Sequence, residues 1–209
     1  MRVQPHAGAE LARPVHIAIG FRVKSGHAIA VALSGSAAKP VPMMRLDVAL
    51  SDPKVHETRQ PYHDGFYHQQ EDPKEIARRV RIIERCAKES VTALLASIDG
   101  GATPASKARV CAALVVGSVI DPATVGNPHI RAHASEGRLF RTVLADALAA
   151  HGVGCDVIVE KELPAKAAAG IGQSNAHIKR AVAGFGDAIG SPWRTDEKSA
   201  ATAAWLALC

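Results

Sequence analysis

The first fifty residues contain three short apolar runs that predict three β-strands. The runs are Val15–Phe21, His27–Leu33 and Val41–Leu50, and the turn residues Ser25 and Gly26 separate the first two. A stretch rich in Gly, Ser and Pro separates the second from the third. Because short turns join antiparallel neighbours, the pattern predicts a three-stranded meander.

Further along the chain, apolar positions recur at helical spacing. Asp72, Pro73 and Glu75 have the spacing of a helix start with a capping box. The positions after them predict one long helix with a single apolar stripe, formed by Ile76, Val80, Ile83, Ala87, Val91, Leu94 and Ile98. Gly100 and Gly101 are expected to end this helix.

The remaining chain alternates between strands and helices. Arg109–Gly117 is a continuous apolar run, typical of a strand buried on both faces, and a helix over Ile130–Ala150 and a strand at Asp156–Glu160 follow. Terminal helices are predicted at Pro164–Ala169, Ser174–Ile189 and Thr195–Leu208. Strands joined through helices add in parallel by right-handed crossovers. We therefore expect an α/β fold, with a mixed five-stranded sheet in the order β-β-β-α-β-α-β-α and helices on both faces.

Composition narrows the class of protein without giving its activity. We expect a flexible tail at residues 1–13 and one domain at residues 14–209, a length sufficient for a real core. The net charge of +5 suits a nucleic-acid partner and an ordinary enzyme equally well. Four scattered cysteines without a CxxC pair predict reduced thiols, and the chain has neither a signal-peptide pattern nor an apolar run of about 20 residues. We expect a cytoplasmic protein without a membrane partner.

The last third carries a resemblance to a known family. "AKAAAGIGQSNAHIKRAV" and "PWRTDEKSAATAAWLAL" resemble the C-terminal part of RuvC-type Holliday-junction resolvases, and "HIRAHASEGRLF" is similar to part of the related YqgF-type proteins. The motifs cover about Ala165–Leu208, whereas the order of elements agrees over most of the chain. The resemblance implies a ribonuclease H-like fold, a homodimer, a branched-DNA partner and chemistry that uses Mg²⁺ or Mn²⁺.

The metal ligands of that family are mostly missing from this sequence. The first-strand aspartate has no counterpart at any of the candidate positions Ile19, Gly20 and Arg22. A glutamate expected after the fourth strand would fall near Gly117. Of two aspartates on the final helix, Asp196 matches the first and Ser199 replaces the second. The resemblance thus implies Asp196 as the one remaining metal ligand, whereas the chemistry requires several carboxylates.

Other acidic residues are candidates to complete a rearranged site. They are Asp121, Glu136, Glu160 and Glu162. We name Asp196, Glu162 and Asp121 as the catalytic residues if activity survives. The alternative is that Asp121 starts a loop with Pro122, that Glu160 and Glu162 are hydrated, and that Asp196 is an early-helix acid after a Thr195 cap.

The segment "VHETRQPYHDGFYHQQED" combines His56, His63, Asp64 and His68. Imidazole and carboxylate groups bind zinc, manganese or iron, but this spacing matches no ligand motif. The alternative, which we favour, is a surface loop packed through its aromatic residues Tyr62, Phe66 and Tyr67.

Basic residues support a preferred hypothesis for function. Guanidinium and ammonium groups attract phosphate, and the candidates are Arg22, Lys24, Lys166, Lys179, Arg180, Arg194 and Lys198. We expect a RuvC-like protein that binds branched or duplex DNA, or structured RNA, with a degraded nuclease site and no cofactor. Two alternatives remain: an active Mg²⁺- or Mn²⁺-dependent, structure-selective endonuclease, and a non-catalytic scaffold protein.

Overall fold

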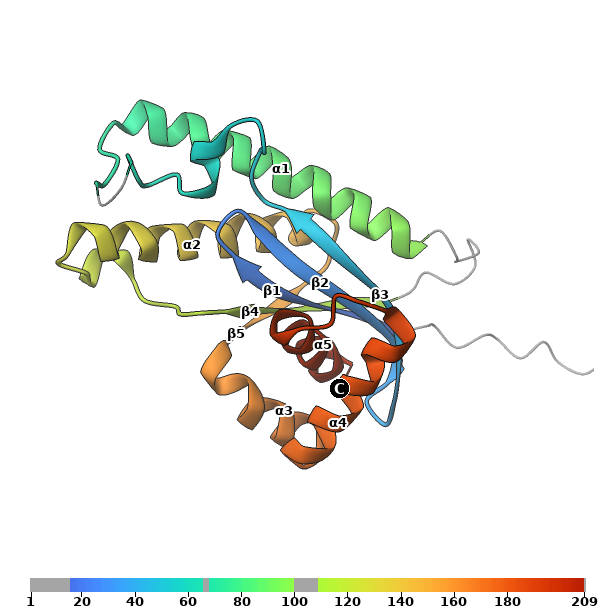
Figure 1. The fold of residues 1–209 in the computed structure, drawn as a ribbon. Coiled ribbons are helices and arrows are strands. Elements are labelled where there is room, and N and C mark those ends of the chain that lie inside the picture. Colours follow the sequence, from blue (N-terminus) through green and yellow to red (C-terminus); the bar gives the residue numbers. More distant parts are fainter. Residues whose placement is uncertain (1–15, 66–67, 100–108, 209) are drawn as a thin grey trace, which may run out of the picture.

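One five-stranded sheet forms the centre of the protein (Figure 1). A computed structural model describes residues 16–65, 68–99 and 109–208. The strands are β1 (His16–Lys24), β2 (His27–Ser36), β3 (Lys39–Ala49), β4 (Arg109–Val116) and β5 (Cys155–Val159). They lie in the order β3-β2-β1-β4-β5, with antiparallel pairing from β1 to β3 and parallel pairing of β1 with β4 and β4 with β5. The predicted α/β fold with a mixed five-stranded sheet is confirmed.

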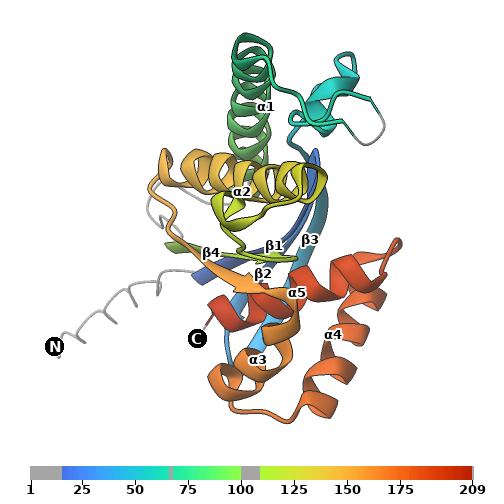
Figure 2. The same cartoon turned by 90° about the vertical axis from the view of Figure 1, so that its left-hand side faces the viewer.

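Helices cover both faces of this sheet (Figure 2). α1 (Pro73–Asp99) and α2 (Pro128–Ala149) lie on one face, and α3 (Leu163–Ile171), α4 (Asn175–Ile189) and α5 (Thr195–Ala207) lie on the other. Short 3₁₀ turns occur at His56–Arg59, Pro122–Thr124 and Glu160–Glu162. The helices begin and end within a few residues of the predicted positions.

The two faces of β1 differ in the size of their side chains. Ile19 and Phe21 are fully buried in the core that α1 and α2 cover. The opposite face offers Gly20 to α5, and a Cβ atom there would lie 1.9 Å from the carbonyl oxygen of Ala200 and 2.5 Å from the amide nitrogen of Ala204. The backbones of β1 and α5 therefore touch, which requires glycine at this position.

This close approach brings charged residues together. Arg22 lies two residues beyond Gly20 and shares its face of β1, because side chains alternate along a strand. Asp196 lies one helical turn before Ala200 on α5. The contact between Gly20 and Ala200 consequently sets Asp196 beside Arg22.

The start of α1 departs from the predicted pattern. Asp72 does accept a hydrogen bond from the Lys74 amide, at 2.8 Å. Glu75, however, binds Arg78 and Arg79 instead of completing the capping box. Arg79 is buried, with 5% exposure, whereas the predicted stripe residues Ile76 and Val80 are only half-buried.

Several predictions concern residues outside the described ranges. The tail at residues 1–13, the aromatic pair Phe66 and Tyr67, and the helix stop at Gly100 and Gly101 all lie there. The assignment of residues 14–209 to a single domain stays a prediction. None of the described helices is long and apolar enough to cross a bilayer.

Candidate functional site

A compact ion-pair network lies at the carboxyl ends of β1 and β5. Nη2 of Arg22 lies 2.5 Å from Oε2 of Glu160, and its Nε lies 3.5 Å from Oδ1 of Asp196. Nζ of Lys24 lies 3.1 Å from the same Asp196 oxygen. The Arg22 side chain is 6% exposed, whereas the two carboxylates are 42% and 35% exposed. A buried guanidinium thus connects two half-exposed acids.

Neighbouring contacts hold these groups in place. Glu160 follows β5 directly, and Nη1 of Arg22 lies 3.4 Å from the carbonyl oxygen of Val115 on the intervening strand β4. Beside Asp196, the buried Glu197 accepts the Arg194 amide at 2.8 Å and binds Arg45 of β3 at 3.1 Å. The Arg194 amide contact anchors the first turn of α5 by satisfying an amide near its start. The predicted Thr195 cap is not observed, since Thr195 is already helical.

These residues do not fit the divalent-metal site that the resemblance implies. A magnesium ion takes oxygen ligands from one or more carboxylates, but both acids here already face cationic side chains. Within residues 16–65, 68–99 and 109–208, no three carboxylates offer oxygens close enough to share an ion. Asp196, the predicted metal ligand, contacts Arg22 and Lys24 instead of a group of metal-binding acids.

The other predicted catalytic acids lie in separate contacts. Asp121 accepts the Ala123 amide at 3.1 Å and begins a 3₁₀ turn, as the loop-starter alternative predicts. It also borders a cavity of about 360 Å³ with Arg138, whose Nη1 lies 3.4 Å away. Glu162 pairs with Lys166 at 3.2 Å, and both side chains are about half exposed. Neither acid pairs with Arg22.

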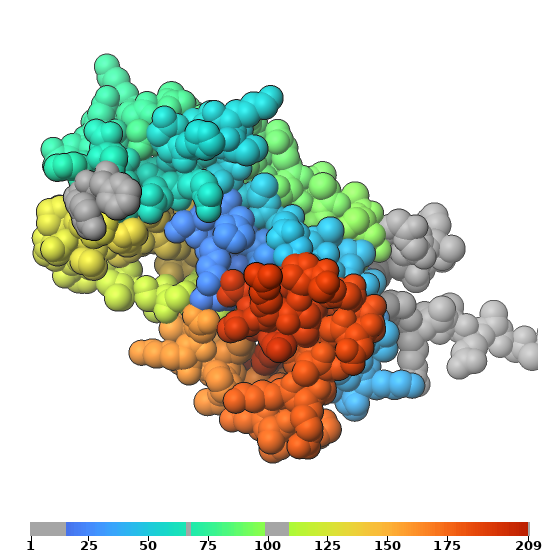
Figure 3. Space-filling view, in the orientation of Figure 1, coloured from blue at the N-terminus to red at the C-terminus, as the bar shows by residue number. Residues whose placement is uncertain are grey.

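The remaining basic candidates lie on the C-terminal helices. Lys179 of α4 and Lys198 of α5 line one cavity of about 340 Å³ between α3, α4 and α5. Arg180 and Arg194 are exposed on the same helical layer, and none of the four makes an ion pair with any residue that the structure describes. Figure 3 shows the side chains of these helices, in orange and red, as one continuous part of the surface.

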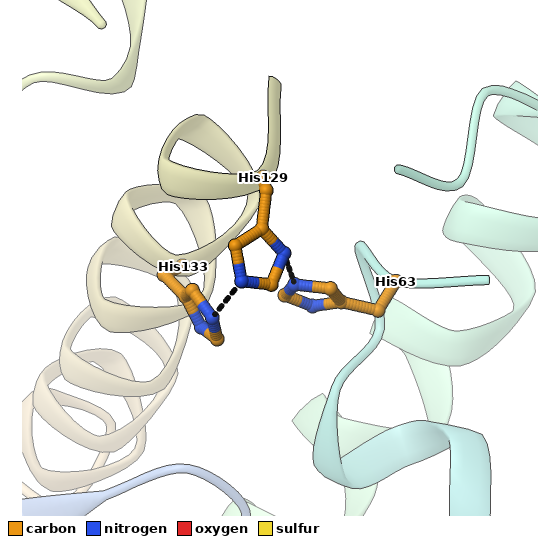
Figure 4. A group of neighbouring side chains, drawn as sticks. All are labelled: His63, His129 and His133. Carbon is orange, nitrogen blue, oxygen red and sulfur yellow. Dashed lines mark hydrogen bonds between the residues drawn. The ribbon is translucent and has the colours of Figure 1, made fainter. Parts of the chain in front are cut away.

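Three histidines come together between the segment that follows β3 and the first turns of α2. We call His63, His129 and His133 the histidine cluster (Figure 4). His63 belongs to the segment between β3 and α1, and the other two belong to the first turns of α2. Nε2 of His63 lies 3.3 Å from Nδ1 of His129, and Nε2 of His129 lies 3.3 Å from Nε2 of His133.

Glu136, which is only 1% exposed, lies behind this cluster. Its Oε1 lies 2.7 Å from Nδ1 of His63, and its Oε2 lies 3.5 Å from Nδ1 of His133. Oε2 is buried and makes no hydrogen bond. Burial raises the pKa of Glu136 to about 7 and lowers the pKa of His63, because each charged form loses hydration.

Sequence reasoning identified only part of this cluster. It named His63 as a metal candidate together with His56 and His68, but neither of those residues belongs to the cluster. A signal was present, since His129 and His133 are four residues apart and Glu136 is three further on, all on one helix face. Only the fold shows that His63, 66 residues before His129, meets this face.

No family model matches the chain, and no curated protein matches its sequence. Among solved structures, RuvC of Thermus thermophilus in complex with a Holliday-junction substrate is 12% identical, with 91% of each chain covered and a TM-score of 0.49. A second structure of Thermus thermophilus RuvC is 13% identical, covers 91% of this chain and 92% of that one, and also gives 0.49. A Ppx/GppA family member from Aquifex aeolicus is 14% identical, with 75% and 40% covered and a TM-score of 0.35.

Proposed function

We propose that this protein binds nucleic acid through phosphate contacts and that the position of a nuclease centre is taken by the ion pairs of Arg22. The main observation in support is the buried Arg22 guanidinium, which faces Glu160 on one side and Asp196 on the other. Arginine stays protonated at every physiological pH, so its charge at this edge is permanent. In this proposal, the guanidinium neutralises acids that would otherwise attract a divalent cation.

The phosphate contacts come from the C-terminal helices. Arg22 and Lys24 are occupied by Glu160 and Asp196, whereas Lys179, Lys198, Arg180 and Arg194 have no acidic partner among the described residues. Cationic side chains without an acidic partner displace the counterions that are condensed on a phosphate backbone, and this release favours binding. The cavity lined by Lys179 and Lys198 lies within this layer, and we place the centre of the contact there.

Binding and its salt dependence test the phosphate contacts. Fluorescence anisotropy would compare Holliday-junction, duplex and single-stranded DNA and structured RNA over a series of salt concentrations. The double variant Lys179→Ala/Lys198→Ala should flatten the slope of log affinity against log salt by about 2, because two phosphate contacts are lost. The matched control is Arg81→Ala/Lys88→Ala, which removes two exposed charges from α1 on the opposite face of the sheet. Absence of binding at low salt, or equal slopes for both double variants, contradicts the proposal.

A cleavage assay separates binding from nuclease chemistry. Junction DNA incubated with the protein and Mg²⁺ or Mn²⁺ should stay intact, and Asp196→Asn should bind it as the unchanged protein does. Cutting that Asp196→Asn abolishes would establish the alternative, an active endonuclease. A homodimer stays a prediction, which light scattering after size exclusion tests directly.

A further inference from the structure

We propose that the histidine cluster binds one divalent transition-metal ion of the zinc type through His63, His129 and His133. Glu136 orients His63 from behind through Oε1, and its Oε2 faces Nδ1 of His133. The inference does not depend on nucleic-acid binding, because the cluster shares no residue with the basic surface of α4 and α5 or with the Arg22 network.

The spacing of the nitrogens suits one ion. One ring nitrogen from each histidine lies within 4.8 Å of one from each of the others. His129 faces His63 with Nδ1 and His133 with Nε2, each at 3.3 Å, so one of these two contacts joins a pair of ligand nitrogens. Zinc bound tetrahedrally at about 2.0–2.1 Å places its ligand nitrogens roughly 3.3 Å apart. Three ligand nitrogens reach this spacing once a ring turns, and His133, at 45% exposure, is the least buried of the three.

Three neutral imidazoles in this arrangement cannot all satisfy one another with hydrogen bonds, and this favours a bound cation. When Glu136 is ionised, Nδ1 of His63 is the donor in their 2.7 Å contact, and Nε2 of a neutral His63 then carries a lone pair directed at Nδ1 of His129. If Nδ1 of His133 is turned toward Glu136 as an N–H, its Nε2 likewise directs a lone pair at His129. A neutral His129 has one N–H and cannot donate to both. A metal ion removes this conflict, because it takes the lone pair of one His129 nitrogen together with those of the other two rings once His133 has turned toward it.

Glu136 supplies the outer-shell arrangement that such a site requires. A ligating histidine commonly donates its other ring N–H to a carboxylate, which fixes the tautomer and strengthens the metal bond. Here one carboxylate faces Nδ1 of both His63 and His133. Oε2 of Glu136 is buried without a hydrogen bond. A divalent ion bound by the rings would compensate the negative charge of this buried carboxylate.

The backbone around the cluster is held in place before any ion binds. Arg79 donates from Nη1 to the carbonyl oxygens of His63, at 2.8 Å, and Pro61, at 3.3 Å, and it is anchored by Glu75. Asn127 caps α2 by accepting the Ile130 amide at 3.1 Å, which fixes the turn that carries His129. His133 is exposed, so solvent reaches the site and water completes the coordination.

Metal titration of the full chain tests the site. After treatment with a chelator, Zn²⁺ would be followed by isothermal titration calorimetry and Co²⁺ by its visible absorption, which reports tetrahedral nitrogen ligation. One ion per chain is expected. His133→Ala should weaken binding by at least about 100-fold and Glu136→Gln by about 10- to 100-fold. His68→Ala is the matched control, because His68 is an exposed histidine of the same segment outside the cluster.

Circular dichroism would verify that each variant is folded, and the exposed position of His133 favours this for His133→Ala. Adventitious binding by surface histidines would give equal affinities in His133→Ala and His68→Ala and would overturn the proposal. Absence of binding to Zn²⁺ and Co²⁺ would also overturn it and would favour a protonated His129 that donates to both neighbours. A failure of the protein to bind nucleic acid would not change the Zn²⁺ and Co²⁺ titrations, so the metal site and the nucleic-acid proposal are tested independently.

Discussion

Arg22 and Glu160 join β1 to β5 across the intervening strand β4, with 2.5 Å between Nη2 and Oε2. Nη1 of the same guanidinium donates to the carbonyl oxygen of Val115 on β4, at 3.4 Å. One side chain therefore connects all the parallel strands of the sheet at the edge where α5 begins. Removing it should affect the stability of the fold as well as the charge of the edge.

Arg22→Ala should lower the free energy of unfolding by about 2 kcal/mol, because a buried charge with hydrogen bonds is lost while its half-exposed acidic partners gain hydration. Urea unfolding would measure the change. Arg109→Ala, which removes an exposed arginine from the start of β4, should leave stability within about 0.5 kcal/mol. Equal effects of the two substitutions would show that the Arg22 contacts contribute nothing.

Gly20→Ala should destabilise the protein by about 3 kcal/mol or more, since the new methyl group meets the α5 backbone and not a movable side chain. Thermal unfolding followed by circular dichroism would detect this loss. The control is Gly117→Ala, where a Cβ meets no atom within 4 Å and the backbone is not left-handed. A normal melting temperature for Gly20→Ala would contradict the close packing of β1 on α5.

The fold should lose stability in acid through Glu75. Hydrogen bonds from Arg78 and Arg79 lower the pKa of Glu75 to about 2, from an ordinary value of 4.5. Because the folded-state pKa is depressed, the stabilisation is complete above about pH 4.5 and is lost as the pH falls toward 2. Unfolding midpoints measured across this window should fall more steeply for the unchanged protein than for Glu75→Gln. Parallel curves would exclude a contribution from Glu75.

Zinc should raise the melting temperature, because an ion that binds only the folded chain stabilises it by RT ln(1 + [L]/Kd). At a free concentration of 100 times Kd, this amounts to about 2.7 kcal/mol. Differential scanning fluorimetry with Zn²⁺ and then with excess chelator would measure the shift and its reversal. At the same zinc concentration His133→Ala should gain no more than about 0.4 kcal/mol, because its binding is at least about 100-fold weaker, and Mg²⁺ should have no effect on either protein. A shift of the same size with Mg²⁺ would contradict nitrogen ligation.

Hydrophobic periodicity predicted most of the architecture because the sheet and long helices each bury a regular pattern. Ile83, Ala87 and Val91 occupy the predicted face of α1 and are fully buried. The same reasoning failed for Arg79, since arginine is usually at the surface and its burial depends on carbonyl groups of a distant segment. Periodicity contains no information about such partners.

The candidate sites were predicted less completely than the fold. Arg22 was recognised as a basic residue in an unexpected place, but its pairing with Glu160 depends on the register between β1, β4 and β5. The histidine cluster combines a local motif, His129 and His133, with one residue from another part of the chain. A search of the sequence for two histidines four residues apart would have found the local half.

The backbone contact between Gly20 and α5 limits how this edge of the sheet can change. With no side-chain layer between the strand and the helix at Gly20, the α5 backbone lies directly against β1, and Asp196 stands one helical turn from that contact. Substitutions at positions 22, 160 and 196 therefore change the charge of this edge while the Gly20 contact with α5 is kept. The backbone contact thus sets where the groups of this edge stand, whereas the side chains at these three positions decide its charge and part of its stability.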